Sequence, residues 1–371
     1  MPLSKKLELF RFNIGGQFMS HFIAIFPALL LIFSSSQATH SAEKRPNIIF
    51  FLIDDLGWSD LGCYGSKYHL TPNIDKLAAM GVRFTQAYSA SPVCSPTRSA
   101  VMTGKNPARL GITDWIGASQ KFNVLVTPKN VKALPQNEVT FAESLKKSGY
   151  ATAYLGKWHL GADDQDHPSF HGFDYHRGVN RAGSPGSYYY PFKRNKKKSK
   201  TALSPSDVPD FDSAKKDSYL TNLLAEEASK FIEKKKDVPF LLMLAHYSVH
   251  TPIQARKNDA MRYEKRMREI GLSSKVSIKK ERYGSTRMTQ NNPDYAAMVE
   301  SVDRSVGKVI RKLEELKLNE NTFIIFTSDN GGLSTLQNNR RAAPTSCLPL
   351  RAGKGWLYEG GIRVPAIMAW P

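Results

Sequence analysis

Two pairs of residues with side-chain oxygen ligands lie far apart in the sequence, and each pair comes just after a short apolar run. They are Asp54-Asp55 and Asp329-Asn330. Three carboxylates and one amide oxygen are hard ligands, which suit Ca²⁺ or Mg²⁺ rather than zinc, since zinc prefers nitrogen and sulfur. Each pair alone also has an ordinary structural explanation, because Asp-Asp after a strand often caps a helix and Asp-Asn-Gly-Gly often forms a turn.

Basic side chains follow other apolar runs in the same manner. Lys157 and His159 come after one such run, and His250 comes after another. His246 lies at the end of the same run as His250 and competes with it for a role. Ligands of open α/β sheets bind beyond the carboxyl ends of the strands, where stability alone requires no charge. The placement therefore predicts one shared site.

The intervening sequence predicts strands that alternate with helices. Short apolar runs predict strands at Asn47–Ile53, Tyr150–Leu155, Val238–Ala245, Thr322–Thr327 and Val364–Trp370. Helical spacing and end signals predict helices over Pro72–Met80, Thr140–Ser148, about 218–235 and 295–316. Thr140 and Glu143 have the spacing of a capping box. The alternation indicates an α/β fold whose central, mostly parallel sheet lies between helices.

The most specific pattern in the chain is the segment 94–104, CSPTRSAVMTG. It resembles the C-x-P-x-R…TG motif of the type I sulfatases, in which the cysteine is oxidised to formylglycine. A buried cysteine at the start of a helix is the structural alternative. The motif is nevertheless specific, because cysteine, proline, arginine, threonine and glycine must all fall in register.

The resemblance covers residues 46–371. Further matching segments are DDLG at 54–57, GKWHLG at 156–161, HTP at 250–252 and LRAGKGWLYEGGIRV at 350–364. The last of these is most similar to the branch of arylsulfatase A and N-acetylgalactosamine-6-sulfatase. The resemblance implies an alkaline phosphatase-like sandwich, and it implies that Lys354 belongs to the active site.

The family's chemistry implies a nucleophile made from Cys94. Its formylglycine would hydrate to a geminal diol, one hydroxyl of which attacks sulfur while the other later expels sulfate. A divalent metal beside the nucleophile would lower its pKa and polarise a sulfate oxygen. We expect Ca²⁺, with Mg²⁺ as the alternative, and the implied metal ligands are Asp54, Asp55, Asp329 and Asn330.

The resemblance also implies roles for five other side chains. Arg98 would hold the diol and a metal ligand. Lys157 and Lys354 would neutralise negative charge that develops on the sulfate. His159 would orient or deprotonate the diol, and His250 would bind sulfate or protonate the departing oxygen.

The composition is that of an ordinary globular protein, with 371 residues, 41% hydrophobic content and a formal net charge of +19. The basic runs at 193–200 and 256–287 are interpreted as solvated loops, and a basic surface would also concentrate anionic substrates. No nucleic-acid-binding module is recognisable. Because the chain has three cysteines, at least one thiol is free, modified or bridged to another chain.

The first 42 residues are interpreted as a signal peptide. Basic residues precede an apolar run at 22–33, which is too short to span a bilayer comfortably. An uncleaved membrane anchor is the alternative. We therefore expect an exported protein, periplasmic or extracellular, or located in the secretory pathway or lysosome of a eukaryote.

The family resemblance implies a smaller C-terminal domain after the strand at 364–370. The chain is therefore expected to hold a truncated catalytic domain over 46–371. Apolar surface left exposed by the missing domain would lower solubility and weaken activity.

The expected function is hydrolysis of sulfate esters, with sulfated carbohydrates as substrates and a formylglycine-generating or sulfatase-maturing enzyme as partner. Two alternatives stay open at this point. One is a phosphonate or phosphate monoester hydrolase of the same superfamily, and the other is an inactive, truncated homologue that binds sulfated glycans. Turnover of an aryl sulfate with added Ca²⁺ separates the three.

Overall fold

The structure, a computed structural model, describes residues 45–119, 126–194, 206–337 and 342–370. The predicted signal peptide, residues 1–42, lies outside the described residues, as does most of the basic run at 193–200. Among the described residues, no helix is long and apolar enough to cross a membrane.

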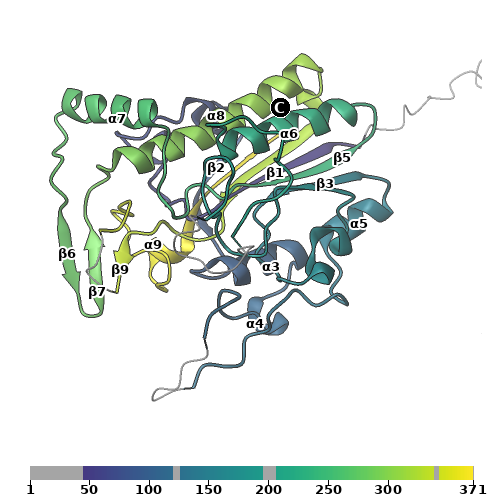
Figure 1. The fold of residues 1–371 in the computed structure, drawn as a ribbon, viewed down its shortest axis with the longest axis horizontal. Helices are drawn as coiled ribbons and strands as arrows, with labels where there is room; N and C mark the ends of the chain where they lie inside the picture. The colour runs from purple at the N-terminus through teal and green to yellow at the C-terminus, as the bar shows by residue number, and fades with distance from the viewer. Residues whose placement is uncertain (1–44, 120–125, 195–205, 338–341, 371) are drawn as a thin grey trace, which may run out of the picture. The chain divides into compact units, whose positions relative to one another are not determined.

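A seven-stranded sheet forms the centre of the fold, in the order β2-β10-β8-β1-β5-β3-β4 (Figure 1). Its strands are β1 (Asn47–Ile53), β2 (Val82–Tyr88), β3 (Ala151–Gly156), β4 (Tyr175–Arg177), β5 (Phe240–Ala245), β8 (Thr322–Ser328) and β10 (Arg363–Ala369). The five strands from β8 to β4 are parallel, whereas β10 runs antiparallel to both β8 and β2. The predicted mostly parallel sheet is confirmed.

The central strands are apolar on both faces because helices cover both sides of the sheet. In β5, Leu242 and Leu244 pack into one core cluster, and the alternate residues Leu241 and Met243 pack into the other. All four side chains are fully buried. Two-sided burial explains why these strands read as continuous apolar runs without polar alternation.

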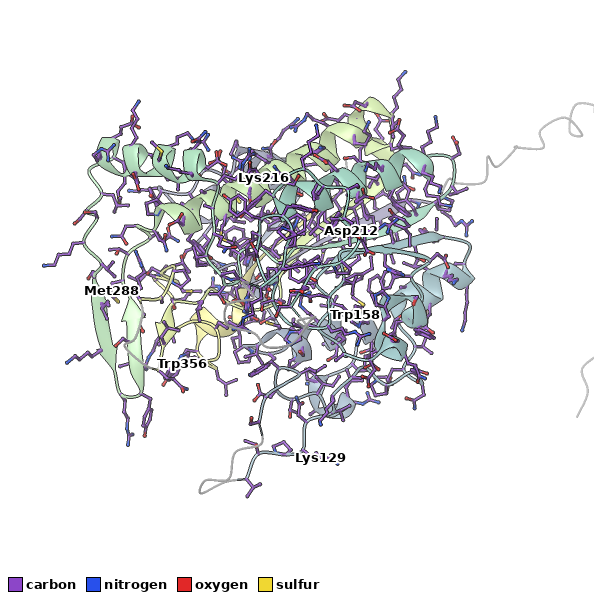
Figure 2. The ribbon with its side chains drawn as sticks, viewed as in Figure 1. Lys129, Trp158, Asp212, Lys216, Met288 and Trp356 are labelled. Carbon is purple, nitrogen blue, oxygen red and sulfur yellow. The ribbon has the colours of Figure 1, made fainter. Side chains whose placement is uncertain are left out.

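The helices form two layers (Figure 1). One layer contains α2 (Pro72–Met80), α6 (Leu220–Lys234) and α8 (Pro293–Glu315), and the other contains α3 (Cys94–Thr103), α4 (Pro107–Leu110) and α5 (Phe141–Lys147). The capping box of Thr140 and Glu143 is present at the start of α5. Trp158 lies on the α3 and α5 side, where its buried indole packs with residues of those helices (Figure 2).

Two parts of the fold differ from the sequence-based prediction. The basic stretch 256–287 is not simply a solvated loop, because it contains α7 (Lys257–Glu269), β6 (Ile278–Glu281) and β7 (Gly284–Arg287), and β7 pairs with β9 (Thr335–Leu336). Tyr263 and Met267 bury one face of α7.

Strand β2 was not predicted, because as an edge strand it is mostly exposed and lacks a continuous apolar run. The remaining short elements are α9 (Glu359–Ile362) and 3-10 turns at Gly62–Tyr64, Asp164–Asp166, Pro168–His171 and Asn319–Asn321.

Candidate active site

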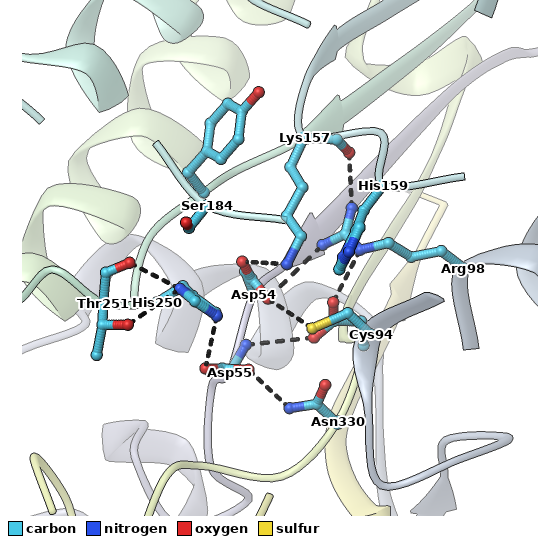
Figure 3. A network of polar contacts seen from close by, with 12 residues as sticks. Asp54, Asp55, Cys94, Arg98, Lys157, His159, Ser184, His250, Thr251 and Asn330 are labelled. Atoms are coloured by element: carbon cyan, nitrogen blue, oxygen red, sulfur yellow. Dashed lines mark hydrogen bonds and ion pairs between the residues drawn. The ribbon is translucent and has the colours of Figure 1, made fainter. Parts of the chain in front are cut away.

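The structure brings the ten predicted site residues together at one edge of the sheet. Figure 3 shows part of this network, around Asp54, Asp55 and Cys94. Neighbouring parallel strands end at the same edge, so the residues that follow β1, β3, β5 and β8 meet there. The first turn of α3 and the segment before α9 approach the same point. The ten residues are Asp54, Asp55, Cys94, Arg98, Lys157, His159, His250, Asp329, Asn330 and Lys354.

The two acidic pairs form one buried cluster. Carboxylate oxygens of Asp54, Asp55 and Asp329 and the Sγ atom of Cys94 all lie within 4.8 Å of one another. The Asp55 backbone N–H donates to Asp329 Oδ1 at 3.2 Å, and Asn330 Nδ2 donates to Asp55 Oδ1 at 2.9 Å. The pairs, separated by more than 270 residues in sequence, therefore face a single point.

These oxygens fit a hard divalent cation. Burial, reinforced by the charges of Asp329 and Asp55, raises the pKa of Asp54 to about 8, although Lys157 lies at 2.6 Å. The buried Oδ1 atom of Asn330 has no hydrogen-bond partner within the described part of the chain. A buried acceptor without a donor is costly, and a cation would satisfy it while keeping Asp54 ionised. The donor set is the one that Ca²⁺ and Mg²⁺ prefer.

Two lysines form ion pairs with the cluster. Lys157 Nζ donates to Asp54 Oδ2 at 2.6 Å, and Lys354 Nζ lies 2.7 Å from Asp55 Oδ1. Burial acts to raise the pKa of Asp55, but Lys354 and His250 outweigh it and hold that pKa below its ordinary value. Lys157 is fully buried beside Asp54, whereas Lys354 lines the cavity that contains Cys94.

Arg98 joins α3 to the ends of two strands. Its Nε donates to Asp329 Oδ2 at 2.8 Å, and its Nη1 donates to the backbone carbonyl of Lys157 at 2.7 Å. Burial opposes its charge, but Asp329 and Asp54 outweigh that effect and raise the pKa of Arg98 above its ordinary value. The guanidinium stays charged and fixes the start of α3 against the acidic cluster.

Cys94 is the first residue of α3 and is only 2% exposed. Its Sγ lies 3.6 Å from Asp54 Oδ1 and 3.3 Å from Lys354 Nζ. Burial raises the pKa of the thiol to about 12, in spite of the two nearby lysines. An unmodified thiol at this position is a poor nucleophile at neutral pH, because the thiolate is the reactive form.

The two predicted histidines each use one ring nitrogen to hold their position. Nε2 of His159 lies 3.1 Å from the carbonyl of Ile116, and Nδ1 of His250 lies 2.7 Å from the carbonyl of Thr251. A carbonyl only accepts, so these nitrogens carry the protons. Nε2 of His250 is then directed at Asp55 Oδ2, 3.7 Å away.

His246 does not belong to the site. Its ring is buried and Nε2 lies 2.8 Å from Ser305 Oγ on α8. His250 instead lines the cavity that contains Cys94. The geometry thus distinguishes two histidines that the sequence placed near the end of the same strand.

A cavity of about 480 Å³ opens onto Cys94. Besides Cys94, His159, His250 and Lys354, its lining includes residues that carry no recognisable sequence motif: Val93, Trp115, Ile116 and Arg181 to Ser184. Val93 directly precedes Cys94, and the other residues come from two loops that meet the cavity only in the folded chain.

A further buried carboxylate, that of Asp60, holds the loop that follows the first acidic pair. It accepts from the Gly57 backbone N–H at 2.8 Å, from Tyr295 Oη at 2.6 Å and from Thr345 Oγ1 at 2.7 Å. Gln290 Nε2 donates to it as well, at 2.9 Å. The sequence signal was a third aspartate in the same loop, which we did not assign.

Asp60→Ala is expected to lower the free energy of unfolding by about 3 kcal/mol or more. The substitution leaves several buried donors without an acceptor, and each such group costs about 1–3 kcal/mol. Denaturant titration measures the change, and Asp212→Ala is the control because Asp212 is exposed. A loss no larger than that of the control would show that the network contributes nothing.

The chain is similar to known proteins over most of its length. The Sulfatase family pattern matches residues 46–371. The chain is 33% identical to N-acetylgalactosamine-6-sulfatase of Canis lupus familiaris, over 92% of this chain and 60% of the relative. It is also 33% identical to steryl-sulfatase of Homo sapiens, over 93% of this chain and 65% of the relative. The chain thus spans less than two thirds of the length of these curated relatives.

Solved structures show the same similarity. The crystal structure of Ps i-CgsB superposes with a TM-score of 0.69 and 34% identity, covering 88% of this chain and 66% of that one. A second structure of that protein is a complex with k-i-k-neocarrahexaose. The sulfatase PsFucS1 from Pseudoalteromonas sp. superposes with a TM-score of 0.63 and 28% identity, over 94% of this chain and 65% of that one.

The fold and the buried acidic cluster define an alkaline phosphatase-like α/β protein with a candidate metal centre at the carboxyl edge of its sheet. The chain belongs to the Sulfatase family.

Proposed function

We propose that this protein hydrolyses sulfate esters of carbohydrates, with a formylglycine derived from Cys94 and a divalent metal. The observation that carries the proposal is the position of Cys94. Its side chain is buried against three carboxylates and a lysine, and burial suppresses thiolate chemistry there. A modified residue with hydroxyl groups at that position explains the site better than an inert thiol does.

The hydrated formylglycine would supply one hydroxyl that displaces the alcohol from sulfur and a second whose loss of a proton releases sulfate and restores the aldehyde. Arg98 would fix the nucleophile-bearing helix turn through Asp329. Lys157 and Lys354 would stabilise negative charge that develops on the sulfate oxygens. Lys354 lines the cavity, and Lys157 would act through its ion pair with Asp54. His250 would bind sulfate or protonate the departing alcohol oxygen. The second role needs a proton on Nε2 as well, taken up before the alcohol leaves, because Nδ1 already carries the proton that faces the Thr251 carbonyl.

The proposed metal ligands are the oxygens of Asp54, Asp55, Asp329 and Asn330. When bound, Ca²⁺ or Mg²⁺ would polarise the sulfate and acidify the attacking hydroxyl. The buried, unpartnered Oδ1 of Asn330 supports this assignment. We propose Ca²⁺, because its flexible coordination tolerates ligands from two separate strand ends.

Carbohydrate substrates are proposed from the relatives. One is named for N-acetylgalactosamine 6-sulfate chemistry, and one structural relative was solved with a carrageenan-type hexasaccharide. A maturation enzyme would have to convert Cys94. Export from the site of synthesis stays a prediction.

The test is a turnover panel on protein that has been co-expressed with a sulfatase-maturing enzyme. The panel contains sulfated galactose, sulfated N-acetylgalactosamine and an aryl sulfate, each with matched phosphate and phosphonate esters. We expect kcat/KM for the sulfate esters to be at least about 100-fold higher, which corresponds to roughly 2.7 kcal/mol in transition-state free energy. A phosphonate preference of that size would assign the protein to the alternative class. Binding without turnover by fully converted protein would contradict the enzymatic proposal.

A further inference from the structure

A loop over residues 114–118 fixes an indole at the rim of the Cys94 cavity. Trp115 lines the cavity and is 46% exposed. Its neighbour Ile116 donates its backbone N–H to Ser95 Oγ at 2.9 Å and lies with its carbonyl 3.1 Å from Nε2 of His159. The backbone of this loop is therefore tied to Ser95, which follows Cys94, and to His159, and these bonds keep Trp115 at the rim of the cavity.

The tryptophan ring also has a backbone support. Gly117 has a φ of +108°, and a Cβ atom there would lie 2.7 Å from the indole. Glycine thus lets the ring lie close over the turn. An exposed aromatic ring that the fold holds in place is suited to stacking on the apolar face of a sugar.

A second loop brings a guanidinium to the same cavity. Asn180, which is buried, donates to the Ser184 carbonyl at 2.9 Å and accepts from the Ala182 backbone at 3.2 Å. Gly183 passes directly over the His159 ring, since a Cβ atom there would lie 2.3 Å from the ring. This packing positions Arg181 at the cavity wall.

In the described part of the chain, the ion pair of Arg181 is with Asp164, outside the acidic cluster. Its side chain is 61% exposed, and its partner Asp164 is 89% exposed. An ion pair between two solvated groups is weak and exchanges readily for a better anion. A guanidinium binds sulfate or carboxylate groups through two parallel hydrogen bonds.

We propose that Trp115 and Arg181 form a second subsite that recognises a glycan with another anionic group beside the sulfate to be cleaved. This inference rests on the proposed function. Trp115 would stack on the sugar that carries the reacting sulfate, which faces Cys94 and Lys354. Arg181 would bind a sulfate or carboxylate on the neighbouring sugar. The substrate class is then a polyanionic glycan, rather than an isolated monosulfated sugar.

The test compares three disaccharides that share one cleavable sulfate. The first has no other charge, the second has a further sulfate on the neighbouring sugar, and the third has a carboxylate there. We expect the converted enzyme to favour one or both doubly charged substrates at least tenfold in kcat/KM, mainly through KM. Arg181→Ala should remove this preference. Arg268→Ala, which removes an exposed arginine of α7, should retain it.

Two other variants distinguish a subsite from a structural tether. Asp164→Asn removes the carboxylate that competes for Arg181. If Arg181 forms a subsite, KM for the doubly charged substrates should fall. If the ion pair only holds the loop in place, kcat/KM should fall for all three substrates. Trp115→Ala should raise KM for all three disaccharides. Equal losses on all three substrates in Arg181→Ala would overturn the proposal, as would an unchanged preference.

Binding separates failure of the subsite from failure of the proposed function. Calorimetry with the Cys94→Ala variant and the same disaccharides needs no turnover. The subsite is supported if Cys94→Ala binds a doubly charged disaccharide more tightly and if the double variant Cys94→Ala/Arg181→Ala loses this difference. That result holds even if no sulfate ester is hydrolysed. Equal binding of the singly and doubly charged disaccharides would overturn it.

Discussion

Cys94→Ala is expected to lower kcat for sulfate ester hydrolysis by about 10⁴-fold or more, the loss typical of removing a catalytic nucleophile. The alanine keeps Cβ but lacks the sulfur, so Cβ cannot be converted to the aldehyde whose hydrate would supply the attacking hydroxyl. The Sγ atom contributes contacts to Asp54 and Lys354 but no backbone bond, so the fold should persist. Steady-state kinetics on an aryl sulfate and thermal unfolding measure both effects.

Cys63→Ala is the matched control, because Cys63 is a half-buried cysteine outside the site. It should retain activity. Peptide mass spectrometry across residue 94 should show the oxidised form in active protein, and activity should scale with its fraction. Activity in Cys94→Ala close to that of the parent, or full activity of protein whose Cys94 is unmodified, would refute the nucleophile assignment.

Removal of divalent cations with a chelator is expected to abolish turnover and to lower Tm. Buried carboxylates repel one another without a cation, and burial already raises the pKa of Asp54 to about 8. A metal that binds only the folded protein at 100 times its Kd adds about 2.7 kcal/mol to the free energy of unfolding. Adding back Ca²⁺ or Mg²⁺ should restore both activity and Tm, and the ion that does so at the lower concentration is the better fit.

Asn330→Ala tests the ligand set while it keeps every charged side chain of the cluster, although it also removes the hydrogen bond from Asn330 Nδ2 to Asp55 Oδ1. It removes Oδ1, which has no hydrogen-bond partner among the described residues. We expect metal affinity to fall at least about tenfold, because the loss of residues that hold metal ligands in place already costs that much. Asn258→Ala is the control, since Asn258 is exposed on α7. Calorimetric titration with Ca²⁺ measures the difference. Equal affinities in the two variants would remove Asn330 from the proposed ligands.

Local patterns predicted most of the sheet and its helices. β1, β5 and β8 are continuous apolar runs, and burial on both faces by two helical layers leaves few alternatives for such sequences. β2 escaped prediction because nearly all of its residues are exposed and it has no continuous apolar run. The role of α7 also escaped, since its apolar face consists of two buried residues, Tyr263 and Met267, within a basic stretch.

By itself, the sequence determined which residues could take part in the chemistry, because the motifs around Cys94, Lys157 and Lys354 depend on residue type and register alone. It also indicated that they would lie near one another, because parallel strands end at one edge of a sheet. The H-x-P match at 250–252 favoured His250 over His246, and the tertiary structure gives the reason. The chain turns after β5 so that His246 packs against Ser305, whereas His250 lines the Cys94 cavity. Only the structure brought Trp115 and Arg181 to the same cavity. Their loops are held by hydrogen bonds and close packing on His159, contacts between segments that no local pattern encodes.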